Sequence, residues 1–187
     1  LLTGVRLHPE ATLLDYGCGS GDLILAFGPR VAQIDGADLA PEATAVAHRR
    51  SAAAGLTSRI WVTAGDGLPP GLDEQYDAAY STRCLQHVAV RAIRQRILTS
   101  LFAALRPGGV LAIQMGYGPV DGPAVAYDAD DLTAAQDPDE VQVEVRHPAE
   151  IGADLTAIGF TDPWFALTAP ADRDRQGALR QTQFRRH

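Results

Sequence analysis

The sequence predicts an α/β fold, in which helices cover both faces of a doubly wound and mostly parallel sheet. Short apolar runs alternate with helical segments as far as Met115. The runs are continuous rather than alternating, as expected for strands that are buried on both faces. Strands that alternate with helices imply parallel crossovers. A cluster of glycines also follows the first apolar run, where such sheets bind their ligands.

The elements of the first half follow from local patterns. The expected parallel strands are the apolar runs Thr12–Leu14, Val31–Ile34, Ile60–Val62, Tyr76–Tyr80 and Val110–Ile113. Pro41 opens an alanine-rich helix that Gly55 ends, with proline at the start and glycine at the stop. A second helix follows from apolar residues that recur every four positions over 93–105, just before Arg-Pro-Gly-Gly.

Beyond the fifth strand this rhythm breaks. Residues 116–140 are rich in Gly, Pro and Asp, and we expect a long insertion there, because long loops in compact domains are often functional. The remaining expected elements are a strand at Val141–Val145, a helix at Pro148–Ile158 that ends at Gly159, and an antiparallel pair at Trp164–Thr168 and Gln181–Arg185. We therefore predict a single domain over residues 1–187, with an antiparallel C-terminal strand in its sheet.

Composition excludes several classes of function. The net charge of −7 disfavours nucleic acid as a partner. No apolar run reaches membrane-spanning length and no signal peptide is evident, so we expect a cytoplasmic protein without a membrane partner. All 16 basic residues are arginine, which excludes Schiff bases, pyridoxal phosphate anchoring and a phosphate-loop lysine. Small molecules are the expected substrates.

The two cysteines, Cys18 and Cys84, are far apart and lack the spacing of a metal or redox motif. This suits reduced, buried thiols better than a disulfide or a zinc site. We expect no bound metal.

The stretch LLDYGCGSGDL, residues 13–23, carries glycines at alternate positions 17, 19 and 21. A tight turn needs one or two glycines, so a third suggests that a ligand lies against the main chain. Dinucleotide sites prefer the spacing G-x-G-x-x-G, whereas this loop reads G-x-G-x-G and is followed by Asp22.

Carboxylates surround the predicted site. Asp15 precedes the loop, Asp38 ends the second strand region and Asp66 follows the third strand. Together with Asp22 they oppose a pyrophosphate and favour a cationic ligand.

Four stretches, in this order, resemble motifs of the class I S-adenosylmethionine-dependent methyltransferases: LLDYGCGSG, GADLAPEATAVAHRR, AGDGL and LRPGGVLAI. The resemblance covers Thr12 to Gly109. It implies the Rossmann-like methyltransferase fold with a seven-stranded sheet, S-adenosylmethionine as the cofactor and S-adenosylhomocysteine as the product.

The resemblance also implies roles. Asp15 and the glycine loop would flank the methionine part, Asp38 would accept from the ribose hydroxyls, and Asp66 with Gly67 would meet the adenine edge. The full implied cofactor-binding set is Asp15, Gly17, Cys18, Gly19, Gly21, Asp38, Leu39, Asp66, Gly67 and Ser81.

Some of these carboxylates have structural alternatives. Asp38 could be the N-cap of the helix that follows it. Asp66 could be an ordinary turn residue. Asp22 could cap the first helix rather than contact the ligand.

The end of the fourth strand is where this family usually presents acceptor-side residues. His87 is the candidate catalytic base, because an imidazole can accept a hydroxyl proton near neutral pH. The other acceptor-side candidates are Tyr117, just after the fifth strand, and Arg83. Arg83 belongs to a group with Arg91, Arg94 and Arg96, which either recognises an acidic acceptor or forms a solvated helix face.

The expected reaction is an in-line displacement, in which an oxygen, nitrogen or carbon nucleophile of a small molecule takes the methyl group. The sequence lacks the Asn/Asp-Pro-Pro-Tyr run of base and glutamine N-methylation, and the acid that metal-dependent catechol-type enzymes use as a ligand. Two alternatives stay open. One is a cofactor-binding domain that serves as a partner subunit or catalyses another reaction, such as a cyclisation; the other is a nicotinamide oxidoreductase.

One departure from the family concerns the start of the chain. Only Leu1–Ala11 precede the first strand, where the family usually has helices that cover the cofactor. We expect that an N-terminal segment is absent from this chain, or that the site is covered by another subunit, as in a homodimer, or by residues 116–140.

Overall fold

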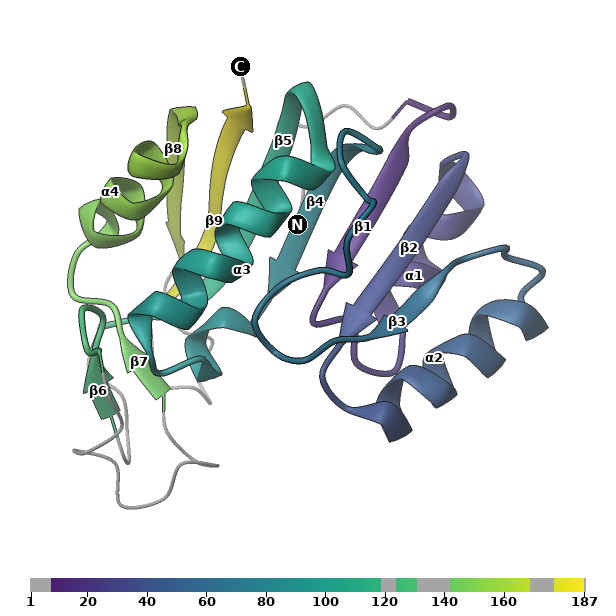
Figure 1. Ribbon diagram of the computed structural model, residues 1–187, viewed down its shortest axis with the longest axis horizontal. Coiled ribbons are helices and arrows are strands. Elements are labelled where there is room, and N and C mark those ends of the chain that lie inside the picture. Colours follow the sequence, from purple (N-terminus) through teal and green to yellow (C-terminus); the bar gives the residue numbers. More distant parts are fainter. Residues whose placement is uncertain (1–7, 119–123, 131–141, 169–176, 187) are drawn as a thin grey trace.

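The computed structural model describes residues 8–118, 124–130, 142–168 and 177–186. It confirms the α/β class, with a seven-stranded sheet in the order β3-β2-β1-β4-β5-β9-β8 (Figure 1). The first five strands run parallel, and β9 lies antiparallel between β5 and β8. The strands are β1 (Thr12–Tyr16), β2 (Gln33–Asp38), β3 (Ile60–Val62), β4 (Tyr76–Thr82), β5 (Leu105–Tyr117), β8 (Phe160–Thr168) and β9 (Gly177–Arg186).

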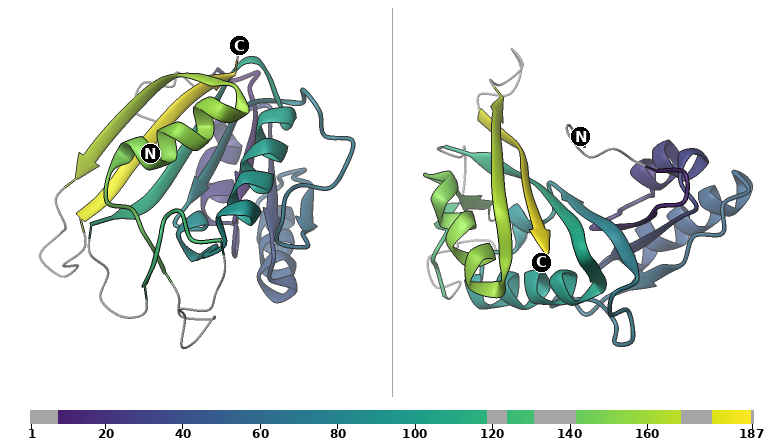
Figure 2. Two further views of the ribbon diagram at one scale, coloured as in Figure 1. Left: turned by 60° about the vertical axis from the view of Figure 1, so that its left-hand side comes forward. Right: turned by 90° about the horizontal axis from the view of Figure 1, so that it is seen from above.

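Helices cover both faces of this sheet. They are α1 (Asp22–Phe27), α2 (Pro41–Ala53), α3 (Arg91–Ala104) and α4 (Pro148–Ile158), with 3-10 turns η1 (Gly28–Arg30) and η2 (Leu85–His87). α1 and α2 lie on one face and α3 and α4 on the other (Figure 2). Because β1 is covered on both faces, Leu13 and Leu14 are both fully buried, although they point in opposite directions.

The structure differs from the sequence expectations around the fifth strand. β5 continues through Gly116 and Tyr117, which we expected in the insertion. It does so because β9 runs alongside and pairs with both residues.

Within the expected insertion, the described part contains a further strand, β6 (Ala124–Ala126). It pairs with β7 (Gln142–Glu144), the strand that the alternating valines predict, in a separate two-stranded sheet. Much of the expected insertion, including 131–140, lies outside the described residues.

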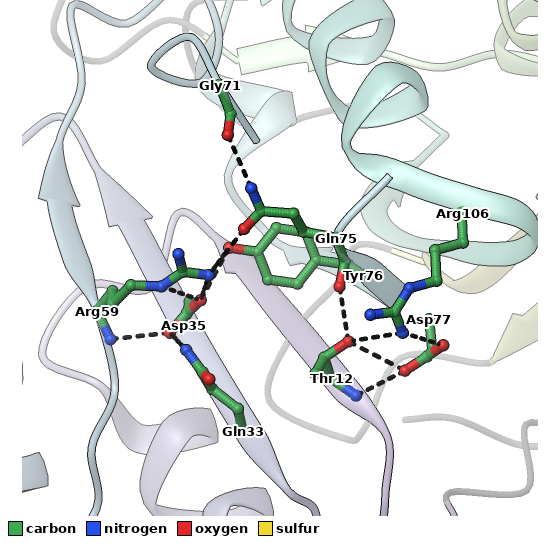
Figure 3. Close-up of polar contacts among 9 residues, drawn as sticks. All are labelled: Thr12, Gln33, Asp35, Arg59, Gly71, Gln75, Tyr76, Asp77 and Arg106. Atoms are coloured by element: carbon green, nitrogen blue, oxygen red, sulfur yellow. Dashed lines mark hydrogen bonds and ion pairs between the residues drawn. The ribbon is translucent and has the colours of Figure 1, made fainter. Parts of the chain in front are cut away.

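A polar network fixes the amino ends of the parallel strands, opposite the glycine loop (Figure 3). Asp35 of β2 is fully buried and accepts hydrogen bonds from the Arg59 guanidinium, the Tyr76 hydroxyl and the Gln33 amide. Nearby, Asp77 accepts from the backbone N–H of Thr12 at 2.7 Å. A buried charge with this many partners is compensated and keeps the strands in register.

None of the helices in the described ranges is long and apolar enough to cross a membrane.

Candidate functional site

The glycine loop lies where the sheet changes direction. β1 is flanked by β2, which follows it in the chain, and by β4, which the chain reaches only after β3. The carboxyl ends of β1, β2 and β4 point to the same edge, at the bottom of Figure 1. In open α/β sheets this is the place where ligands bind.

Three glycines of the loop have positive φ, for different reasons. The φ angles of Gly17, Gly19 and Gly21 are 79°, 51° and 82°. A Cβ at Gly17 would lie 2.4 Å from the Cβ of Cys84, so close packing requires glycine there. A Cβ at Gly19 would meet no atom within 4 Å. Gly19 therefore faces open space, as expected where a ligand approaches the main chain.

Asp38 ties the loop to the end of β2. Its Oδ2 accepts from the backbone N–H of Gly19 at 2.7 Å, and its Oδ1 accepts from the backbone N–H of Ala40 at 2.9 Å. The N-cap of α2 is Ala40, so the alternative that Asp38 is that N-cap is wrong. Each carboxylate oxygen has a second lone pair, which leaves room for the two hydroxyls of a ribose.

Asp15 is buried beside the loop without full compensation. Only 1% of the residue is exposed, and its Oδ1 has no hydrogen-bond partner. Burial, and then the Asp38 carboxylate, raise the pKa of Asp15 well above its usual range. An orphaned carboxyl oxygen at this place fits a site that a cationic ligand group completes.

A second turn, residues 63–68 after β3, carries Asp66 and Gly67, which the sequence predicts for the adenine side. Leu39 is 62% exposed, and a Cβ at Gly65 would lie 3.3 Å from its Cδ1. The half-exposed carboxylate of Asp66 lies 3.8 Å from the Nε of Arg96. Leu39 thus contacts the turn at the residue before Asp66, and an apolar side chain and an acceptor at one turn suit the face and the amino edge of an adenine.

The far end of this turn rests on α3. A Cβ at Gly67 would lie 3.0 Å from the Oγ of Ser100, and the same Oγ accepts from the backbone N–H of Leu68 at 3.1 Å. Gly67 is therefore a place where the main chain packs closely, beside the acid.

Cys18 and Cys84 are both free thiols at the loop. Cys18 packs between β2 and α1, since a Cβ at Gly36 would lie 2.9 Å from its Sγ. Cys18 would therefore contact a ligand through its backbone atoms rather than through its thiol. Burial, and then the Asp38 carboxylate, raise the pKa of Cys84 to about 11. Ser81, which is also in the predicted cofactor-binding set, is buried near the end of β4.

The expected acceptor-side residues come together at the same edge. His87 is exposed at the end of η2. Its neighbour Gln86 is buried, and the Oε1 of Gln86 accepts from the backbone N–H of Gly116 at 2.9 Å. This bond fastens η2 to the end of β5, next to Tyr117. Gln86 was not predicted, because its partner is 30 residues away.

Arg83 occupies an unusual backbone position between β4 and η2. Its φ is 57°, and its backbone N–H donates to the carbonyl of Gln114 on β5 at 2.9 Å. A positive φ in a residue other than glycine often marks a functional site. The side chain of Arg83 is exposed.

The arginines of α3 have other roles than expected. Arg94 is only 1% exposed and donates to the carbonyls of Val88 and Ala89 at 2.6 and 2.8 Å, and to that of Tyr127. Arg91 forms an ion pair with Asp154 of α4 at 2.7 Å. The solvated-face alternative is wrong for Arg94, which is buried because residues 124–130 pack against the start of α3. The side chain of Arg91 is 38% exposed and is paired with α4.

Asp22 does not cap α1. The N-cap is Gly21, which makes no side-chain cap, and Asp22 is the first residue of the helix. Its carboxylate is 78% exposed and lies 2.7 Å from the Nη1 of Arg50. A carboxylate in the first turn still stabilises the helix, because its negative charge interacts favourably with the positive end of the helix dipole.

In the described parts of the chain, no three His, Cys, Asp or Glu side chains cluster in a way that could hold a metal ion.

Comparisons with known proteins agree with this arrangement. The family model described as "Methyltransferase domain" matches residues 13–109. The chain is 33% identical over 114 residues to the tuberculostearic acid methyltransferase of Mycobacterium tuberculosis. The aligned region covers 61% of this chain and 26% of that protein. The chain is 36% identical over 121 residues to the trans-aconitate 2-methyltransferase of Paracidovorax citrulli, covering 62% of this chain and 42% of that protein. The chain thus spans less than half the length of these relatives.

Solved structures show the same fold. An S-adenosylmethionine-dependent methyltransferase of Methanosarcina mazei matches with a TM-score of 0.73 at 21% identity, over 96% of this chain and 94% of that chain. The cyclase SpnF matches with a TM-score of 0.70 at 19% identity, over 96% of this chain and 76% of that chain.

The family model spans the glycine loop and the strand ends that carry Asp38 and Asp66, and both relatives are methyltransferases. The chain therefore belongs to the methyltransferase domain family, in the class I S-adenosylmethionine-dependent group.

Proposed function

We propose that this protein transfers a methyl group from S-adenosylmethionine to an oxygen, nitrogen or carbon of a small molecule. The observation that carries the proposal is the open space at Gly19, whose backbone N–H donates to the carboxylate of Asp38. Negative surroundings stabilise a sulfonium and an ammonium, and they oppose the pyrophosphate of a nicotinamide cofactor. Membership of the methyltransferase family also argues against that oxidoreductase alternative.

The residues that hold the cofactor fall into three groups. The backbone of Gly17–Gly21, with Asp15, would bind the methionine part. Asp38 would accept from the ribose hydroxyls. Leu39, Asp66 and Gly67 would contact the adenine, while Cys18 and Ser81 would line the site.

S-adenosylmethionine, when bound, supplies a methyl group on an activated sulfonium leaving group. The work left to this chain is mainly alignment, since orientation alone can contribute roughly 7 to 11 kcal/mol to a rate. Gln86 would help by holding η2 against β5, so that His87 and Tyr117 face one acceptor. His87 would take the proton from a hydroxyl acceptor, and Arg83 and Tyr117 would orient it.

The acceptor class rests on the relatives. Their names refer to small molecules, tuberculostearic acid and trans-aconitate. We take this as support for a small-molecule acceptor in the present chain as well.

The test is release of S-adenosylhomocysteine when the protein and S-adenosylmethionine are incubated with a panel of carboxylic acids, phenols and amines. For a hydroxyl acceptor, His87→Gln should lower kcat about a hundredfold or more, because it removes the general base. His48→Gln changes an exposed histidine of α2 and should have no effect. Equal activity of the two variants would reject the role of His87.

The second candidate is a cofactor-binding domain that does not transfer methyl groups. The likeness to a solved structure named as a cyclase supports this second candidate. Binding of S-adenosylhomocysteine together with silence across the whole acceptor panel would support this second candidate over the first.

A further inference from the structure

Arg50 of α2 lies against the glycine loop, although it is not part of the cofactor-binding set. Its Nη1 donates to the backbone carbonyl of Ser20 at 2.8 Å and lies 3.2 Å from the Oγ of the same residue. The same nitrogen forms an ion pair with the Asp22 carboxylate at 2.7 Å. A guanidinium in the last turn of α2 is therefore bonded to the main chain of the loop, across 30 residues of sequence.

The packing of α2 brings Arg50 to this position. Ala47 is only 1% exposed, and a Cβ at Gly21 would lie 3.0 Å from the Cβ of Ala47. The helix and the loop come this close because Gly21 has no side chain. Residues three positions apart share one face of a helix, so Ala47 and Arg50 both face the loop.

The centre of the loop is a tight turn that consists largely of glycine. The backbone N–H of Gly21 donates to the carbonyl of Cys18 at 2.9 Å, which closes a turn over residues 18–21. Gly19 and Gly21, on either side of Ser20, both have positive φ. Glycine restrains the backbone little, so bonds from outside the turn are needed to fix its peptide groups.

Two charged side chains supply such bonds, one on each side of the central peptide group of the turn. Asp38 accepts from the backbone N–H of Gly19 at 2.7 Å, and Arg50 donates to the carbonyl of Ser20 at 2.8 Å. The peptide group between these two bonds joins Gly19 to Ser20. Among the described residues, the N–H of Ser20 has no hydrogen-bond acceptor. The two bonds thus hold in place a peptide group whose own donor is unpaired.

The charge of Arg50 does not conflict with a site for a cationic ligand. The Asp22 carboxylate lies 2.7 Å from its Nη1 and offsets its charge. A bond from a charged donor to a carbonyl is also stronger than one between neutral groups. The pair of Arg50 and Asp22 therefore restrains the loop and adds little net charge to it.

We propose that Arg50 is a positioning residue of the cofactor site, which holds the Ser20 carbonyl and thereby fixes the turn that receives the amino-acid part of S-adenosylmethionine. This inference rests on the proposed function, since it assumes that the loop binds the methionine part of that cofactor. The effect of Arg50 is confined to one part of the ligand, because it bonds to the glycine loop and not to the turn after β3.

The experiment compares two ligands by calorimetry: S-adenosylhomocysteine and 5′-methylthioadenosine, which has the same adenosine and thioether but lacks the amino-acid part. The wild-type protein should prefer S-adenosylhomocysteine about tenfold or more, since the other ligand lacks the groups that bond to the loop. Arg50→Met should weaken S-adenosylhomocysteine about fivefold, because a loop that is not held in place has to be ordered on binding. The affinity for 5′-methylthioadenosine should change by less than about twofold.

Arg49→Met is the matched control. Arg49 is the preceding residue of α2, and its side chain is exposed. The substitution removes the same charge and adds the same side chain one position away from the loop contact. It should leave both dissociation constants unchanged, so that a general effect of charge on the ligands is separated from the bond to Ser20.

The ratio of the two dissociation constants decides the outcome. An unchanged ratio in Arg50→Met overturns the inference, whether both affinities fall together, as for a merely structural role, or neither does. A wild-type protein that binds both ligands equally also overturns it. If Arg50→Met does not fold, the ratio measured for Arg50→Gln decides in its place. A folded wild-type protein that binds neither ligand overturns the proposed function itself.

Discussion

The backbone conformation of Gly19 and the buried carboxyl of Asp15 are two features that the packing of the folded chain does not require. Gly19 has a positive φ, yet no neighbouring atom occupies the place of a side chain. Asp15 is a buried carboxyl with an oxygen that nothing binds. Both features are costly or neutral for the folded chain: the open space at Gly19 fits a ligand that approaches the main chain, and the unpaired oxygen of Asp15 fits a polar group of that ligand.

Gly19→Ala should weaken the binding of S-adenosylhomocysteine by about tenfold or more, because a methyl group would occupy the open space that the ligand needs. Gly55→Ala is the control, since Gly55 also has a positive φ and no atom within 4 Å of a Cβ, but lies after α2. Both variants should lose about 1 kcal/mol of stability from backbone strain. Equal affinity of the two variants, measured by calorimetry, would contradict the role of Gly19.

Asp15→Asn should stabilise the protein at neutral pH and weaken ligand binding. The folded state raises the pKa of Asp15, so the protonated form is favoured, and this contribution to stability is complete below the ordinary pKa of the carboxyl and lost as the pH rises through the raised value. The gain in unfolding free energy over wild type should therefore grow from pH about 5 to about 8, toward about 1 to 3 kcal/mol. Urea denaturation at both pH values measures it. A variant that is clearly less stable than wild type at pH about 8 would refute this account.

At the scale of elements, two assemblies meet at the site. β1, β2 and the turn after β3 carry the residues expected to bind the cofactor, whereas η2 and the end of β5 carry those expected on the acceptor side, and residues 124–130 pack against the start of α3. Arg94 joins parts of the second assembly, since it bonds to carbonyls on both sides of it and stacks 4.5 Å from the ring of Tyr127. Removing it should loosen the acceptor side and leave the cofactor side in place.

Arg94→Met should lower the unfolding free energy by roughly 2 to 4 kcal/mol, because buried carbonyls lose their donors. The affinity for S-adenosylhomocysteine should change by less than about twofold, since distant sites act independently. Arg49→Met, at an exposed position of α2, should change neither quantity. Denaturation curves and calorimetry test both values; a large loss of affinity in Arg94→Met would show that the two assemblies are not separate.

At the scale of the whole molecule, the sequence predicted the sheet and the glycine loop well. The positions of β1 and β4 could be predicted because both faces of a parallel strand are buried, so the apolar run is continuous. The expected strand Val31–Ile34 was misplaced, since β2 spans Gln33–Asp38 and includes polar residues. The loop could be predicted because its glycines stand at alternate positions 17, 19 and 21, and all three have positive φ. The grouping of the acids that follow the strands could also be predicted, because the carboxyl ends of parallel strands meet at one edge of the sheet.

Other features depend on partners that are distant along the chain. Arg91 reaches Asp154 across 63 residues, and no local pattern indicates this ion pair. The small sheet pairs β6 with β7. The sequence pattern predicts a loop at the first of these segments and a strand without a partner at the second. The homodimer, the cytoplasmic location and the covering of the site by further segments stay predictions.

The most direct test of the central claim is the crystal structure of this chain with S-adenosylhomocysteine. The account predicts electron density along Gly17–Gly21, with the ribose hydroxyls on Asp38 and the adenine between Leu39 and Asp66. A cleft without the ligand at saturating concentration, or a diphosphate against the loop, would contradict it.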